Sequence, residues 1–116
     1  MKTTTLGNQA EQTVAEELNR QGYKILDRNW KTKVCEIDIV ASKEKVVYFV
    51  EVKFRSGQAQ GSGLEYIGPQ KLRRMHFAAE VWVQAHKYDG DYSLLAASVM
   101  CDGLNFIVED VLEVEL

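Results

Sequence analysis

The chain has 116 residues, of which 46% are hydrophobic and 27% charged, and its formal net charge is −3 at pH 7. This length allows one domain, over residues 1–116. The composition is typical of a soluble globular protein, and no apolar run approaches the ~20 residues of a membrane span. The N-terminus has no apolar stretch typical of a signal peptide, and Cys35 and Cys101 lie too far apart for a zinc motif, so we expect a cytoplasmic domain without a membrane partner.

The first part of the chain predicts a helix followed by a strand. Apolar residues recur at helical spacing from Leu6 to Leu18, and Gly22 is a suitable C-terminal stop, which places a helix at about residues 8–21. Residues 23–30 then predict a first strand.

Residues 35–55 predict a β-hairpin, because apolar residues fill alternate positions and β-branched and aromatic residues dominate. The charged residues on one face of its strands are Glu36 and Asp38 in the first, and Glu51 and Lys53 in the second. A turn centred on Glu44 and Lys45 would place Asp38 opposite Glu51, and Glu36 opposite Lys53, with roughly 4.5–5.5 Å between Cβ atoms. Two carboxylates at that separation repel unless a cation lies between them or one is protonated.

Two interpretations of these charges are open. Alternating charges on a hairpin usually form a solvated face with weak ion pairs. The same face, however, carries Val34, Val40, Val47 and Phe49, and the opposite face is almost wholly apolar from Ile37 to Phe54. We therefore expect both faces to be covered and the charges to form a partly buried cluster, which favours a functional site.

The second half predicts another helix and further strands. Residues 56–63 form a polar, glycine-rich loop that could close over a neighbouring site, and Pro69 opens a helix whose first turns carry Lys71, Arg73 and Arg74. Basic residues are unfavourable at a helix N-terminus, so these three are candidate phosphate contacts, with ordinary surface residues as the alternative. Residues 94–100 and 104–108 predict strands, whereas residues 110–116 fit a short helix or a strand equally.

The net negative charge conceals a basic middle of the chain. Residues 20–74 contain twelve basic and six acidic residues, whereas residues 102–116 contain five acidic and no basic ones. A basic surface for nucleic acid is therefore compatible with the overall charge.

The predicted order of elements, αβββαβ, resembles the restriction-endonuclease-like nucleases of the PD-(D/E)xK superfamily. Asp38 corresponds to the first acid and Glu51-Val52-Lys53 to the (D/E)xK element. Over nearly the whole chain the sequence resembles the YraN family of uncharacterised bacterial proteins, which is similar to archaeal-type Holliday junction resolvases. The residues that carry this resemblance are Gly7, Glu11, GYKILDRNW (22–30), EIDIVA (36–41), FVEVKFR (49–55), Lys71, Ala78 and Ala79.

This resemblance implies an α/β (α+β) fold in which a central mixed sheet is flanked by helices. It implies that Asp38 and Glu51 ligate Mg²⁺ or Mn²⁺, that Lys53 positions or activates the attacking water, and that Glu11 reaches the same centre. Glu36 would support these residues, and Arg55 would join the basic residues of the second helix in binding DNA.

The expected function is a metal-dependent endonuclease acting on DNA, branched or damaged DNA included, with a symmetric homodimer as candidate assembly. The alternative is a nucleic-acid-binding module that keeps the fold without turnover. Two residues depart from the family pattern: Cys35 replaces a Gly, and Ser93 replaces an Asp.

Overall fold

The computed structural model describes residues 5–56, 67–103 and 105–115, which form two helices and a five-stranded sheet. The elements are α1 (Thr5–Arg20), β1 (Lys24–Lys31), β2 (Glu36–Lys43), β3 (Val46–Ser56), α2 (Pro69–Ala85), β4 (Asp91–Asp102) and β5 (Asn105–Val114). The strands lie in the order β1-β2-β3-β4-β5, and only the β3–β4 pair is parallel. This mixed sheet confirms the predicted α+β fold with an αβββαβ core.

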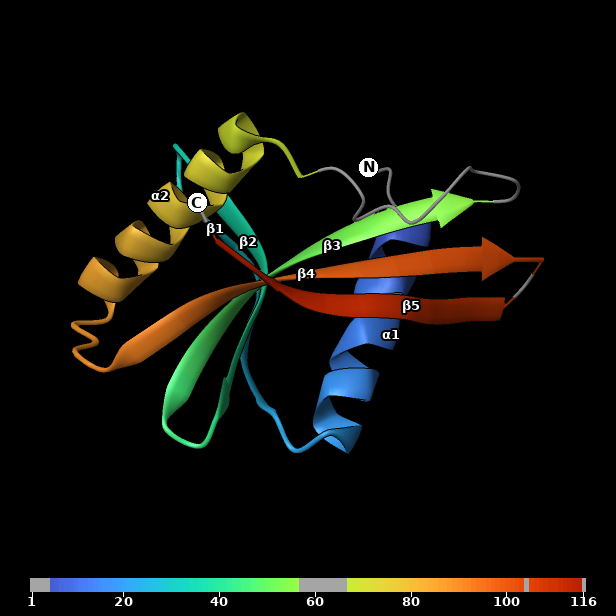
Figure 1. The fold of residues 1–116 in the computed structure, drawn as a ribbon, viewed down its shortest axis with the longest axis horizontal. Helices are drawn as coiled ribbons and strands as arrows, with labels where there is room; N and C mark the ends of the chain where they lie inside the picture. The colour runs from blue at the N-terminus through green and yellow to red at the C-terminus, as the bar shows by residue number, and fades with distance from the viewer. Residues whose placement is uncertain (1–4, 57–66, 104, 116) are drawn as a thin grey trace.

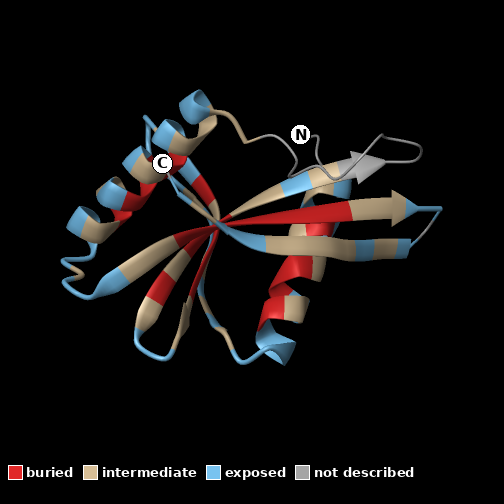
Figure 2. Ribbon diagram, viewed as in Figure 1, coloured by how far each residue is buried: buried red, intermediate tan, exposed pale blue. Residues whose placement is uncertain are grey.

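The two helices cover opposite faces of the sheet, as Figure 1 shows. The α1 side is closed by a cluster that includes Val14, Leu18, Ile39 and Val50, whereas the α2 side is closed by a second cluster around Phe49 and its neighbours. Buried residues therefore lie along the centre of the sheet and the inner sides of both helices (Figure 2). The prediction that both hairpin faces are covered is confirmed between Ile37 and Val50, whereas Glu36 and Lys53 beyond this segment are exposed.

The ends of α1 and of the β2–β3 hairpin follow from local backbone geometry. Gly22 has φ +96°, and the N–H groups of Gly22 and Tyr23 donate to the carbonyls of Asn19 and Leu18, which is the Schellman arrangement. Glu44 and Lys45 have φ +51° and +71°, the signs that a type I′ turn requires at both central positions. The turn lies where the sequence predicted it.

The C-terminal residues form one continuous strand. β5 pairs with β4 from Asn105 to Val114, with a shift of register opposite Ser98 and Val99. Residues 98 and 99 pair with residues 110 and 108, so Glu109 is the additional residue of a β-bulge. This bulge shifts the apolar alternation between Val108 and Val111, and residues 110–116, predicted as either a short helix or a strand, are strand as far as Val114.

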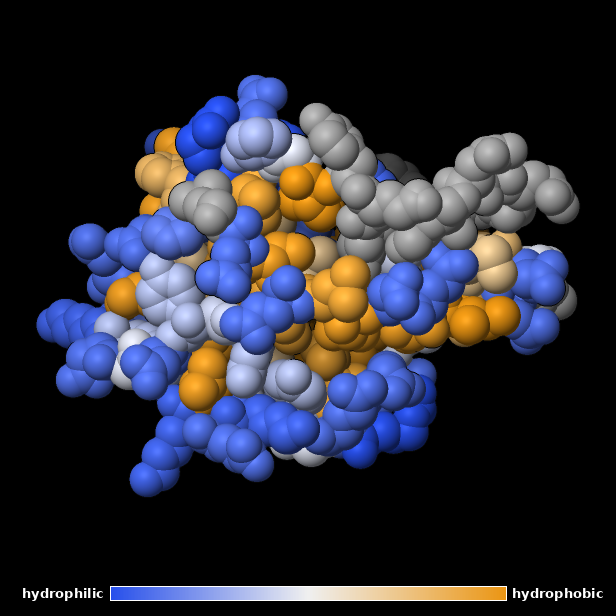
Figure 3. Space-filling model, viewed as in Figure 1, coloured by the Kyte–Doolittle hydropathy of each residue, from blue (hydrophilic) through white to orange (hydrophobic). Residues whose placement is uncertain are grey.

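The surface carries a mixture of apolar and hydrophilic side chains. On the face in Figure 3, apolar residues gather in the middle of the view and hydrophilic residues surround them. Within the described residues, neither helix is long and apolar enough to cross a membrane.

Candidate active site

The candidate site lies where β2 and β3 separate. Their ladder runs from Lys43–Val46 to Ile39–Val50, in the register that the sequence predicted, and the next residues along are Asp38 and Glu51. Beyond this point the Asp38 carboxylate accepts a hydrogen bond from the Val52 N–H at 2.8 Å. A side chain of β2 thus replaces the backbone partner that Val52 would have in a continued ladder. The predicted Glu36–Lys53 pair lies beyond the end of the paired segment.

At Asp38, the alternation of side chains between the two faces of the sheet is interrupted in β2. Ile37 packs in the cluster beneath α2, whereas Ile39 packs in the cluster beneath α1. Residues two apart share a face in a regular strand, so the predicted placement of Ile37 beside Ile39 was wrong. The irregularity lets the Asp38 side chain lie in the gap between the strands, within reach of residues from both sides of the sheet.

The environment of Asp38 opposes its negative charge. Burial is the main effect and, with the neighbouring Glu51, Glu11 and Glu36, raises the pKa of Asp38 from its ordinary value of 3.8 to about 7. The hydrogen bond from Val52 acts in the opposite direction but does not compensate. A half-buried carboxylate with a raised pKa next to other acids is the arrangement expected of a cation site or a catalytic acid.

Helix α1 contributes Glu11 from the opposite side of the sheet. Its Oε1 atom is buried and has no hydrogen-bond partner among the residues that the structure describes, and burial raises the pKa of the Glu11 carboxyl. Asn29 and Arg28 lie close enough to lower that pKa in part, and Asp38 interacts with it as well. The resemblance placed Glu11 at the same centre as Asp38, and the structure brings the two side chains together.

Asn29 was not among the predicted site residues. It belongs to β1, yet its φ is +52°, in the left-handed region that Asn tolerates better than most residues. Its neighbours Arg28 and Trp30 pair with Ile39 and Ile37, so Asn29 stands beside Asp38 in the sheet. The only sequence signal at this position is the residue type, because the strand pattern around it is otherwise regular.

Helix α2 supplies a cation to the cluster. The Lys71 ammonium lies 2.7 Å from Glu51 Oε2, and the two side chains are 36% and 25% exposed. Lys71 shares one flank of α2 with Arg74 and Ala78, at the i, i+3 and i+7 positions. In this structure Lys71, and not Lys53, is therefore the lysine in contact with Glu51.

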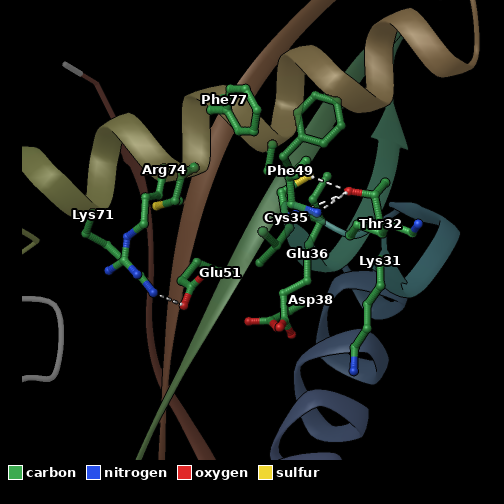
Figure 4. A pocket seen from close by; sticks show the side chains of 16 residues that line it. Lys31, Thr32, Cys35, Glu36, Asp38, Phe49, Glu51, Lys71, Arg74 and Phe77 are labelled. Carbon is green, nitrogen blue, oxygen red and sulfur yellow. Dashed lines mark hydrogen bonds and ion pairs between the residues drawn. The ribbon is translucent and has the colours of Figure 1, made fainter.

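Asp38, Glu51 and Lys71 line a cleft of about 590 Å³ between α2 and the loop that joins β1 to β2. Figure 4 shows the carboxylates of Asp38 and Glu51 beneath α2, with Thr32 and Cys35 on the opposite wall. Acidic groups lie on its floor, whereas Lys31, Lys33, Lys71 and Arg74 line its sides. A polyanion can thus approach along basic walls toward an acidic floor.

The other predicted residues are placed as follows. Glu36 is exposed and lines the cleft. Lys53 is exposed, lies outside the cleft lining and forms no ion pair with any described residue. Arg73 is exposed on another side of α2, and the side chain of Arg55 lies outside the described residues.

The two departures from the family pattern differ in position. Cys35 lines the cleft, and its Sγ lies 3.5 Å from the Thr32 hydroxyl. Ser93 lies away from the cleft, pairs with Tyr48 and donates a hydrogen bond to Glu113 at 2.5 Å. Only Cys35 can therefore affect the site directly. Val34, predicted on a covered face, is 69% exposed, because it lies in the loop before β2 begins.

The carboxylate oxygens of the acidic cluster are chemically suited to bind a hard divalent cation. Carboxylate oxygens are the preferred ligands of Mg²⁺ and Mn²⁺. No positive charge contributes to the pKa of Asp38, and Arg28 offsets only part of the effect of burial on Glu11. Within the described part of the chain, however, no group of three or more His, Cys, Asp or Glu side chains forms a ready metal site. To bind the metal, the Glu51 carboxylate would have to give up its ion pair with Lys71.

Comparison with known proteins finds one family and many relatives. The model of a family described as uncharacterised protein family UPF0102 matches residues 10–106. A UPF0102 protein of Fusobacterium nucleatum is 38% identical over 94 residues, covering 81% of this chain and 78% of that protein. A UPF0102 protein of Vibrio campbellii is 34% identical over 113 residues, covering 93% of each chain. A third, of Anaeromyxobacter dehalogenans, is 42% identical over 81 residues, covering 70% of this chain and 60% of that protein.

Proposed function

The chain belongs to the uncharacterised protein family UPF0102, and we propose that it is a metal-dependent nuclease that hydrolyses phosphodiester bonds in DNA. The observation that carries this proposal is the half-buried Asp38 carboxylate at the point where β2 and β3 separate, whose pKa of about 7 reflects desolvation beside Glu51 and Glu11 without a sufficient counter-charge. Such a cluster destabilises the fold and is difficult to explain as a structural ion-pair network. Its position on the floor of a cleft with basic walls supports a polyanionic substrate.

Each residue has a defined task in the proposed reaction. Asp38 and Glu51 would hold Mg²⁺ or Mn²⁺, and Glu11 would complete the acidic centre from α1. The bound metal would stabilise the negative charge that develops on the phosphate and would favour deprotonation of water. Lys71 and Arg74 would bind the phosphate, and Lys53, which has no ion-pair partner among the described residues, would orient the attacking water.

A nucleic-acid-binding module without turnover is the second candidate. The Lys71–Glu51 ion pair favours it, because this contact occupies one of the two principal metal ligands. The basic walls would serve such a module equally well, whereas the uncompensated Asp38 carboxylate would have no purpose in it.

The two candidates are separated by a cleavage assay on linear, flapped and four-way DNA with Mg²⁺ and with Mn²⁺. The nuclease predicts metal-dependent cleavage of at least one substrate and its loss in Asp38→Asn. DNA that is bound but uncut in both metals would support the binding module, and DNA that is neither bound nor cut would exclude both.

Location and assembly belong to the same proposal. Cys35 and Cys101 are both unpaired, which agrees with a reducing, cytoplasmic setting. A symmetric homodimer would allow two clefts to act on the two strands of a branched DNA. Sedimentation with and without DNA would test the dimer.

A further inference from the structure

Two exposed apolar side chains face the same cleft. Phe77 on α2 is 52% exposed and Val34 on the β1–β2 loop is 69% exposed, and both line the cleft that contains Asp38 and Glu51. Phe77 lies one helical turn beyond Arg74 on the same side of α2. Single exposed apolar residues are common on protein surfaces, but here two of them, from different elements, line one concave site.

The wall that carries Val34 is fixed by its own hydrogen bonds. The Thr32 hydroxyl accepts the N–H of Val34 at 3.1 Å and the N–H of Cys35 at 3.2 Å, and the Thr32 N–H donates to the Cys35 carbonyl at 2.9 Å. These contacts hold the loop in a tight turn. Val34 is therefore presented at a defined position, opposite an aromatic ring that a regular helix holds in place.

Charge decides what kind of molecule fits between these walls. Lys33 directly precedes Val34, Lys31 lies three residues before it, and Arg74 lies one helical turn before Phe77, so each apolar side chain has positive charge near it in the cleft lining. A ligand that matches both features has a flat, weakly polar part attached to an anionic group. A nucleotide has this chemistry, because its base stacks on aromatic side chains while its phosphate binds Lys and Arg.

We propose that Phe77 and Val34 form a subsite for an unpaired nucleobase next to the phosphate that Lys71 and Arg74 would bind in the same cleft. In an intact duplex both faces of a base are covered by its neighbours, so only an unpaired base can stack on Phe77. The cleft therefore selects DNA with unpaired nucleotides, such as flaps, gaps or branch points, over continuous duplex. This inference rests on the proposed function, since it assigns the substrate class of the same cleft.

The test compares Phe77→Ala with Leu112→Ala by fluorescence anisotropy on flapped DNA and on duplex DNA, with Ca²⁺ present so that binding is measured without cleavage. Leu112 is a matched control because it is 48% exposed, lies on β5 and does not line the cleft. Loss of one stacked base weakens binding by about 5- to 150-fold, so Phe77→Ala should lose at least fivefold on flapped DNA. It should stay within twofold of wild type on duplex, and Leu112→Ala should match wild type on both.

A second readout reports stacking itself. With 2-aminopurine at the unpaired position, wild type should quench the fluorescence of the base, Phe77→Leu should quench it less, and Phe77→Ala should leave it unquenched. If wild type binds flapped DNA and Phe77→Ala binds and quenches equally, the subsite is refuted while the nuclease proposal stands. If wild type binds no form of DNA, the proposed function itself fails and the subsite fails with it.

Discussion

Replacing Asp38 with Asn is expected to stabilise the metal-free protein and to abolish the stabilisation that metal provides. One pKa unit corresponds to about 1.36 kcal/mol, so a rise from 3.8 to about 7 means that the ionised carboxylate costs the fold about 4 kcal/mol. Asn can still accept the hydrogen bond of the Val52 N–H, as the protonated Asp38 does, and the stronger bond to the ionised carboxylate is already included in the net pKa shift. The variant should therefore gain about 4 kcal/mol at pH 8, or roughly 15 °C in melting temperature.

The stabilisation of the fold by Asp38→Asn should decrease as the pH falls. Because the folded-state pKa of Asp38 is raised, the protonated carboxyl stabilises the folded state fully below pH 3.8, and this contribution is lost as the pH rises to about 7. At pH 5 the folded wild type is largely protonated at Asp38. The advantage of Asp38→Asn should then shrink to about 2 kcal/mol.

The assay is thermal or urea unfolding of wild type, Asp38→Asn and Asp102→Asn at pH 5 and pH 8, with and without Mn²⁺. Asp102 is exposed at the end of β4 and controls for the change in net charge. With Mn²⁺ at a hundred times its dissociation constant, wild type should gain about 2.7 kcal/mol, and Asp38→Asn should gain little. If Asp38→Asn melts below wild type at pH 8 and Mn²⁺ shifts neither protein, the cluster is a structural network and our account is wrong.

Three further predictions follow from the positions of the lysines and arginines. Lys53→Ala should reduce single-turnover cleavage about 10²- to 10⁴-fold with unchanged melting, and a wild-type rate would remove Lys53 from the mechanism. Lys71→Gln should raise Mn²⁺ affinity up to about fivefold in calorimetry without DNA, because the exposed ion pair to Glu51 contributes about 0.2–1 kcal/mol; unchanged affinity would mean that the two cations do not compete. Neutralising Lys71 and Arg74 should lower the salt slope of duplex binding by about 0.9 for each lost phosphate contact, whereas Arg73→Gln should leave the slope unchanged. An equal effect of Arg73→Gln would mean that the DNA-binding surface is not the wall of the cleft.

The hairpin and the first helix could be predicted because local rules determine them. Period-two alternation fixed the register around Glu44 and Lys45 even without the usual Asn-Gly signal, since a slip of one residue would expose the whole apolar face. Gly22 ended α1 for the equally local reason that its φ is positive.

The contacts of the site could not be predicted in the same way. The Lys71–Glu51 ion pair joins residues of α2 and β3 and depends on how the helix lies across the sheet. Asn29 enters the site through a left-handed backbone that a strand pattern does not indicate. Lys53 follows Glu51 at the motif spacing, yet it lies outside the cleft lining.

The most direct test of the central claim is the anomalous diffraction of a crystal soaked in Mn²⁺. We predict one Mn²⁺ peak in contact with the carboxylates of Asp38 and Glu51, with the Lys71 ammonium displaced from its present 2.7 Å contact with Glu51. A crystal that shows no Mn²⁺ at these two carboxylates, with the Lys71–Glu51 ion pair intact, would contradict a metal-dependent mechanism at this site.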